Sequence, residues 1–136
     1  MTSGKVIELF VLGLLVFLAF DSVWLVRIAP KLYKQYIGHL MAKKPDLQAA
    51  GLFYGLYIVG LLVFVLVPAI NMGSITHALG YGALYGLFTY ATFDLTSQAV
   101  LKNWPWAITG IDMLWGSFVT MTSSTVVYAL YSHFIK

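Results

Sequence analysis

Residues 6–26 read VIELFVLGLLVFLAFDSVWLV, a run in which Glu8 and Asp21 are the only charged residues. One helix needs about 20 mostly apolar residues to cross the hydrocarbon core of a bilayer. The run begins after Lys5 in the manner of a secretory signal peptide, but it has no small-x-small cleavage site and continues as far as Val26. We therefore expect residues 6–26 to form a transmembrane helix.

Three further runs of this kind follow, at residues 49–70, 78–101 and 104–135. Hydrophobic residues make up 60% of the 136 residues and charged residues only 10%, whereas a soluble domain carries roughly 25% charged residues. The four runs leave no room for a soluble domain. The sequence therefore predicts an all-α membrane protein, a four-transmembrane-helix bundle that forms a single integral membrane domain over residues 1–136.

The basic residues predict how this bundle is oriented. Most of them lie between the first and second runs: Arg27, Lys31, Lys34, Lys43 and Lys44. Lys102 lies between the third and fourth runs, whereas the turn at residues 71–76 has no basic residue. Because lysine and arginine are enriched in cytoplasmic loops, we expect a multi-pass protein of the cytoplasmic membrane with both termini outside.

The basic segment between the first two runs has the spacing of an amphipathic helix. Its apolar residues recur on one face: Leu32, Tyr33, Tyr36, Ile37, Leu40 and Met41. Pro30 suits a first helical turn and Pro45 marks an end. We predict a short interfacial amphipathic helix at residues 30–44, lying on the inner leaflet with its lysines near anionic membrane lipids. A partner-docking helix or a helical extension of the first span are the alternatives.

Small residues indicate where helices pack closely. Gly51-x-x-x-Gly55 and Gly82-x-x-x-Gly86 each place two glycines on one helix face, which lets the backbones of neighbouring helices approach each other in lipid. A run of hydroxyl residues in the last helix is interpreted in the same way: Thr120, Thr122, Ser123, Ser124 and Thr125.

Asp21, Asp94 and Asp112 lie inside the apolar runs, where an ionised aspartate at a helix centre costs about 2.5 to 3.5 kcal/mol. Each lies six to eight residues from the cytoplasmic end of its run, which at about 1.5 Å per residue corresponds to a common depth of roughly 9 to 12 Å. No lysine or arginine lies at this depth. At least one of the three is therefore expected to be protonated at neutral pH, or to be neutralised by a bound cation.

Aromatic and polar residues lie one helical turn from these aspartates. Phenol and indole groups can donate hydrogen bonds to a carboxylate, and their rings can bind a cation. The sequence therefore predicts a ligand-binding or proton-binding set: Asp21, Trp24, Tyr54, Tyr57, Tyr90, Asp94, Gln98, Asp112 and Trp115. In the alternative interpretation, one or two of the aspartates only tie helices together.

Other chemistry has less support. Three carboxylates could hold Mg²⁺ or Mn²⁺ for phosphoryl chemistry on a lipid headgroup, but no paired acidic motif or arginine clamp accompanies them. A zinc site of His77, His133 and Glu8 is a weaker possibility. There is no cysteine, and no nucleophile motif or dinucleotide fingerprint occurs. We predict no catalytic residue, metal, cofactor or nucleic-acid partner, and enzyme activity stays open.

Several short motifs occur in a fixed order along the chain: Asp21-x-x-Trp24, Tyr54-x-x-Tyr57, Asp94-Leu95-Thr96, Lys102-x-Trp104-Pro105 and Asp112-x-x-Trp115-Gly116. This ordered set resembles the bacterial predicted-membrane-protein family catalogued as domain-of-unknown-function family 2177, over nearly the whole chain. Members typically have Tyr-Asp-Leu-Thr-Asn where this chain has Phe93 and Ser97. The resemblance implies a four-helix protein of the bacterial inner membrane and supplies no reaction.

Our leading hypothesis is binding or proton-linked transport of a small cationic or amphiphilic molecule in an acidic and aromatic pocket on the cytoplasmic side. A chain this short leaves little interior for a complete pathway, so a homodimer is expected if the protein transports. The alternatives are a lipid-modifying enzyme or its membrane subunit, and a structural membrane assembly factor.

Overall fold

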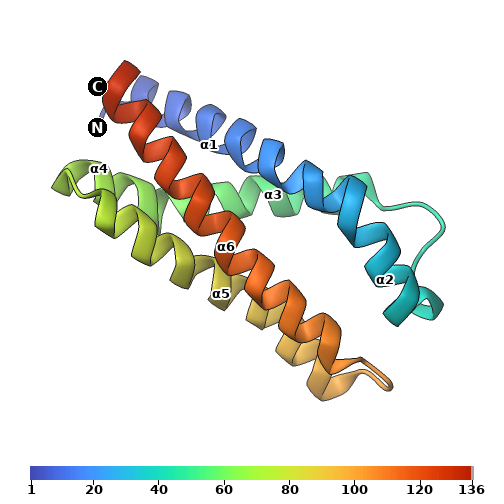
Figure 1. The fold of residues 1–136 in the computed structure, drawn as a ribbon. Coiled ribbons are helices and arrows are strands. Elements are labelled where there is room, and N and C mark those ends of the chain that lie inside the picture. The colour runs from blue at the N-terminus through green and yellow to red at the C-terminus, as the bar shows by residue number, and fades with distance from the viewer. Residues whose placement is uncertain (136) are drawn as a thin grey trace.

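The computed structural model describes residues 1–135, which form helices joined by short connections (Figure 1). The first long helix runs without a break from Ser3 to Leu40. It consists of α1 (Ser3–Val23), a π-helical segment (Trp24–Ile28), α2 (Ala29–Ile37) and a final 3-10 turn (Gly38–Leu40). The prediction of an all-helical chain is therefore confirmed for the described residues.

Three more long helical segments follow in the described residues. The second long helix runs from Leu47 to Met72 and is built from α3 (Leu47–Leu61), a π-helical segment (Leu62–Leu66) and α4 (Val67–Met72). The third is α5 (Ile75–Val100). The fourth is α6 (Trp106–Leu130), which continues as a π-helical segment (Tyr131–Ile135).

Local sequence explains where these helices begin and end. The Asp46 carboxylate accepts hydrogen bonds from the backbone N–H groups of Gln48 and Ala49, both at 3.1 Å, and so caps the start of α3. Gly73 ends α4 with a φ of 62°, a left-handed conformation that glycine adopts without strain. The next residue, Ser74, caps the start of α5 with its hydroxyl.

The segment at residues 30–44 differs from the separate interfacial helix that we predicted. A π-helical segment joins α1 to α2, and Pro30 lies in the first turn of α2. Proline has no backbone N–H to donate, and it is tolerated in the first turn of a helix. The helix ends at Leu40 instead of Lys44. The segment is therefore a continuation of the first long helix, as in one of our alternatives, and its contact with the inner leaflet stays a prediction.

The apolar face of α2 packs against the protein. Ile37 is buried in a small cluster with Trp104 and Ile108, which lie at the turn between α5 and α6 and in the first turn of α6. Leu32, Tyr33 and Tyr36 cover the same cluster. Four of the six apolar residues of this segment thus contact another part of the chain, whereas Leu40 and Met41 are exposed.

Helices α5 and α6 lie side by side along their length (Figure 1). A Cβ added at Gly82 would lie 2.8 Å from the Ser124 hydroxyl, and one added at Gly86 would lie 2.6 Å from the Thr120 hydroxyl. Glycines at these two positions therefore allow the close approach, as the small-x-x-x-small pattern predicted. Gly51 and Gly55 have no such neighbour within the described chain.

Several polar side chains are buried in the bundle beside its apolar core, and large apolar side chains also cover its outer surface. The buried polar residues are Asp21, Asp94, Ser97, Thr109, Asp112, Thr120, Ser123 and Ser124. Large apolar side chains face outward on every long helix, including Phe88 of α5 (62% exposed) and Leu114 of α6 (74% exposed). A soluble monomer rarely exposes so many large apolar side chains, whereas such side chains are stable in contact with lipid.

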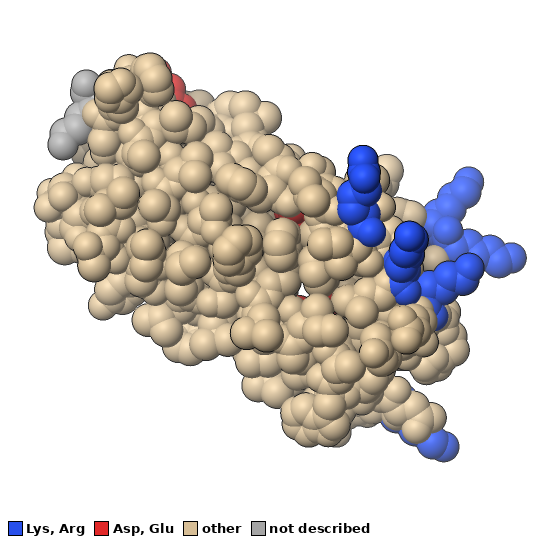
Figure 2. Space-filling model, in the orientation of Figure 1, with Lys and Arg blue, Asp and Glu red and all other residues tan. Residues whose placement is uncertain are grey.

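Two of the helical segments are long and apolar enough to cross a membrane by themselves, Ser3–Leu40 and Leu47–Met72. Both chain ends and the turn after α4 lie at one end of the molecule, and α2 lies at the other (Figure 1). On the face in Figure 2, the lysine and arginine side chains gather at the α2 end, and the rest of the surface is almost free of charge.

Candidate ligand-binding site

Asp21 of α1 is buried, with 3% of its surface exposed. Its Oδ2 accepts a hydrogen bond of 2.8 Å from the Tyr54 hydroxyl of α3, and its Oδ1 accepts one of 3.1 Å from the indole Nε1 of Trp115 in α6. The Trp24 ring stacks on the Trp115 ring with centroids 4.8 Å apart and planes 10° apart. Both carboxylate oxygens therefore have a donor, and the side chain joins three helices.

Asp112 of α6 is buried to a similar degree, with 4% of its surface exposed. Its Oδ1 accepts a short hydrogen bond from the Tyr33 hydroxyl of α2. The Tyr33 ring also meets the Trp24 ring edge-on, with centroids 6.4 Å apart. The partner of Asp112 thus comes from α2, the segment that we had placed on the membrane surface.

Asp94 of α5 has no exposed surface, and neither of its carboxyl oxygens has a hydrogen-bond partner among the described residues. Its carboxyl lies beside that of Asp112 across the contact between α5 and α6. Buried polar groups are nearly always hydrogen-bonded, and an unsatisfied one costs about 1 to 3 kcal/mol. Of the three aspartates, Asp94 is therefore the one whose burial is not offset by any hydrogen bond to its carboxyl among the described residues.

A cavity of about 500 Å³ has the Asp112 carboxyl in its wall. It is lined by Tyr33, Phe53, Thr89, Tyr90, Thr92, Phe93 and Asp112. Four of these seven side chains are aromatic, two are threonines and one is a carboxyl, and no basic residue is among them. Such a lining suits a ligand that is largely apolar and carries a positive charge, because aromatic faces and carboxylates both attract cations.

Of the nine predicted site residues, Tyr90 and Asp112 line this cavity and the other seven do not. Among those seven, Tyr57 and Gln98 have partners other than the aspartates. The Tyr57 hydroxyl shares a short hydrogen bond with the Thr120 hydroxyl, and its backbone carbonyl accepts one of 2.8 Å from the Tyr85 hydroxyl. The Gln98 amide donates to the Trp104 carbonyl and accepts from the Thr109 hydroxyl, both at 2.7 Å. These contacts hold helices together and leave neither side chain free to reach the aspartates.

Sequence reasoning did not identify Tyr33 as a site residue. Its place on the apolar face of an amphipathic segment was interpreted as contact with lipid. The alternative in which this segment extends the first helix could have identified Tyr33. In that arrangement the apolar face of the segment packs against the end of the bundle. Phe53, Thr89, Thr92 and Phe93 also line the cavity without having been predicted as site residues.

The structure does not bring together the residues that we considered as alternative metal ligands. Among residues 1–135, no group of three or more histidine, aspartate or glutamate side chains converges on one point. The three aspartates form two separate groups, one around Asp21 and one of Asp94 with Asp112. His77 stacks on Tyr81, with ring centroids 4.1 Å apart.

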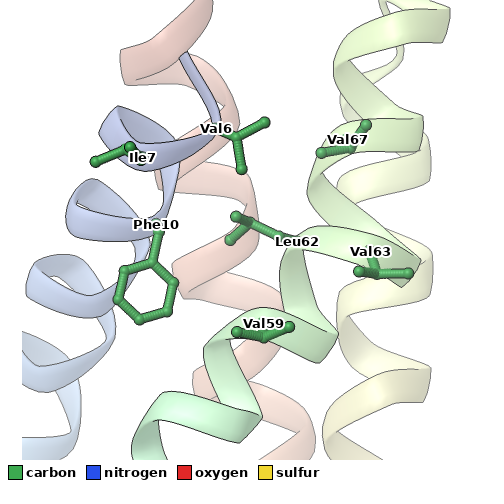
Figure 3. A pocket seen from close by; sticks show the side chains of 7 residues that line it. All are labelled: Val6, Ile7, Phe10, Val59, Leu62, Val63 and Val67. Atoms are coloured by element: carbon green, nitrogen blue, oxygen red, sulfur yellow. The ribbon is translucent and has the colours of Figure 1, made fainter. Parts of the chain in front are cut away.

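A second cavity of about 530 Å³ lies between α1 and the helix formed by α3 and α4 (Figure 3). Its lining is Val6, Ile7, Phe10, Val59, Leu62, Val63 and Val67. All seven side chains are hydrocarbon, so the cavity offers no group that could bind a charge.

Comparison with known proteins places the chain in a family. No curated protein and no solved structure matches it significantly. The model of the family described as Predicted membrane protein (DUF2177) matches residues 6–129, which include parts of all four long helical segments. The apolar exterior and the long apolar helices agree with that description. The chain therefore belongs to this family of predicted membrane proteins.

Proposed function

We propose that this protein is a four-helix integral membrane protein that binds a small organic cation in the cavity beside Asp112. The observation that carries the proposal is a buried carboxyl in the wall of a cavity with four aromatic side chains and no basic residue. A carboxylate in such surroundings needs a counter-charge, and an organic cation supplies it together with apolar surface that matches the walls.

The outward apolar side chains support four crossings of the membrane. Although α5 and α6 contain buried polar residues, they expose Phe88, Leu114 and similar side chains as the first two helices do. The chain ends and the turn after α4 share one end of the bundle, as four antiparallel crossings require (Figure 1). We infer that the basic α2 end faces the cytoplasm and that both termini face outward.

Binding is the step that simple recognition and proton-linked transport have in common. Asp112 is the group best suited to this step, since it lines the cavity and has one donor, Tyr33, among residues 1–135. Asp21 is the contrasting case, because Tyr54 and Trp115 already occupy both of its oxygens.

The test is calorimetric titration of the detergent-purified protein with tetraethylammonium. Asp112→Asn should weaken binding at least tenfold, because it removes the charge and keeps the size of the side chain. Asp21→Asn is the matched control, since it removes a charge that is equally buried but does not line the cavity, and it should leave the affinity within about threefold. Equal affinities of the wild type and Asp112→Asn would disprove the proposal. Thermal melting of each variant verifies that the bundle is folded.

The aromatic walls can be tested separately. Phe93→Leu keeps an apolar side chain but removes a ring from the cavity, and loss of a cation–π contact of about 0.5 to 2 kcal/mol corresponds to a weakening of roughly 2- to 30-fold. Phe118→Leu is the matched control, since Phe118 is an exposed ring that does not line this cavity. Equal weakening by both variants would show that ring contacts in the cavity do not contribute.

A further inference from the structure

The Asp94 carboxyl is fully buried and its neighbour across the helix contact is another carboxyl. An ionised carboxylate can only accept hydrogen bonds, so two ionised carboxylates cannot bond to each other. They would also repel, and two like charges in one buried site are not both retained. A single proton removes both difficulties, because it makes one of the two carboxyls a donor to the other.

The surroundings of the pair indicate where this proton resides. Asp112 already accepts from the Tyr33 hydroxyl and lies in the cavity wall, and both features favour its ionised form. Asp94 has no donor, no exposed surface and no place in the cavity wall, and all three favour its neutral form.

We propose that the Asp94 carboxyl is protonated and donates a hydrogen bond to the ionised Asp112 carboxylate. The pair then presents a single negative charge to the cavity and selects monovalent organic ammonium ions over dications. This inference rests on the proposed function for its ligand, but the placement of the proton does not. Asp94 here is a positioning residue, which acts on the ligand through Asp112.

The groups that face the pair from the neighbouring helices are few. From α2, the Tyr33 hydroxyl donates to Asp112. From α6, the Thr109 hydroxyl lies 3.4 Å from the backbone carbonyl of Asp94 and does not reach its carboxyl. Asp21 of α1 has its own two donors, and no basic side chain of residues 1–135 lines the cavity. The charge of the site is therefore set by the two carboxyls alone.

This charge decides which cations fit. A monocation beside ionised Asp112 and neutral Asp94 leaves the buried site with no net charge. A dication of the same size leaves one positive charge uncompensated in surroundings of low dielectric, which is unfavourable. A doubly ionised pair would have the opposite preference.

Infrared spectroscopy of the ligand-free wild type tests the proton directly. A folded wild type at pH 7 should show the C=O stretch of a protonated carboxyl, and Asp94→Asn should lose it. Asp21→Asn is the matched control and should retain the band, since Asp21 lies outside the carboxyl pair and each of its oxygens accepts a hydrogen bond from another donor. Absence of the band from the wild type, or its persistence in Asp94→Asn, would overturn the inference.

The ligand arm uses the cage diamine DABCO, whose mono- and dimethylated forms are a monocation and a dication of nearly equal size. The wild type should bind the monocation at least tenfold more tightly than the dication. A preference of the wild type for the dication would contradict the inference.

The two arms separate the two proposals. A wild type that has the carboxyl band but binds neither cation would disprove the proposed function and leave the proton on Asp94. A wild type that binds the monocation but lacks the band would disprove the proton assignment and leave the cation site.

Discussion

The indole of Trp115 donates a 3.1 Å hydrogen bond to Asp21 of α1, although Trp115 lies only three residues after Asp112 on its own helix. Tyr33 of α2 provides the donor for Asp112 in its place. The aromatic donors thus bond to aspartates of neighbouring helices. As a result, both oxygens of Asp21 accept a hydrogen bond, whereas Asp112 accepts one from Tyr33 and lies in the wall of the cavity.

Asp21 should matter for stability. Asp21→Ala removes the acceptor of both Tyr54 and Trp115, and we expect it to lower the free energy of unfolding by about 1.5 to 3 kcal/mol, the range for hydrogen bonds to a charged group. Thermal denaturation in mild detergent measures this. Glu8→Gln, at an exposed carboxylate of the same helix, is the control and should have little effect. Equal melting of both variants would contradict a structural role for Asp21.

The glycines of the two small-residue motifs should respond differently to substitution. Gly86→Ala forces a methyl group against Thr120 and the Gly116 backbone, and overpacking of this kind typically costs about 1 to 3 kcal/mol. Gly55→Ala adds a methyl group in open space, where alanine favours the helix by up to about 1 kcal/mol. Melting temperatures should therefore fall for Gly86→Ala only. A similar fall for Gly55→Ala would indicate that Gly55 packs against a second molecule.

The topology can be tested with reporter fusions. Fusions at Asn71 and after the last residue should report an external location, and one at His39 a cytoplasmic location, because the basic residues lie mainly between the first two helices. A cytoplasmic location of the carboxyl terminus would refute the four-crossing arrangement.

The basic end of the bundle should bind anionic lipid. Lys31 and Lys34 are exposed on α2, and a lysine near an anionic membrane surface contributes about 1 kcal/mol. The double change Lys31→Gln with Lys34→Gln should reduce the amount of anionic lipid retained in native mass spectrometry. Retention of zwitterionic lipid should not change, which makes it the internal control. An equal reduction for both lipid types would argue against an electrostatic contact.

The helical elements follow closely from the apolar runs. The run at residues 6–26 lies within the helix Ser3–Leu40, and the run at 49–70 lies within Leu47–Met72. The run at 78–101 corresponds to α5 at Ile75–Val100, so these boundaries differ by only a few residues. Length and hydropathy predict such segments because each one must satisfy its own backbone hydrogen bonds within a helix.

The partners of the aspartates were less predictable. Spacing along one helix pairs Asp112 with Trp115 and Asp94 with Gln98, but in the structure Trp115 bonds to Asp21 and Gln98 bonds to Thr109. A spacing of three or four residues brings side chains to the same face of a helix and leaves the direction of that face undefined. The rotation of each helix within the bundle depends on its packing against the others.

By itself, the sequence determined that the chain is helical, that its exterior is apolar and that three aspartates lie within apolar helices, because these properties depend on composition and on local backbone hydrogen bonds. Only the tertiary structure decided that Asp21 is saturated by donors whereas Asp94 and Asp112 lie side by side next to a cavity. The physical reason is that the rotation and register of α5 and α6 are set by close contacts at Gly82, Gly86 and Gly116, which join residues far apart in the chain.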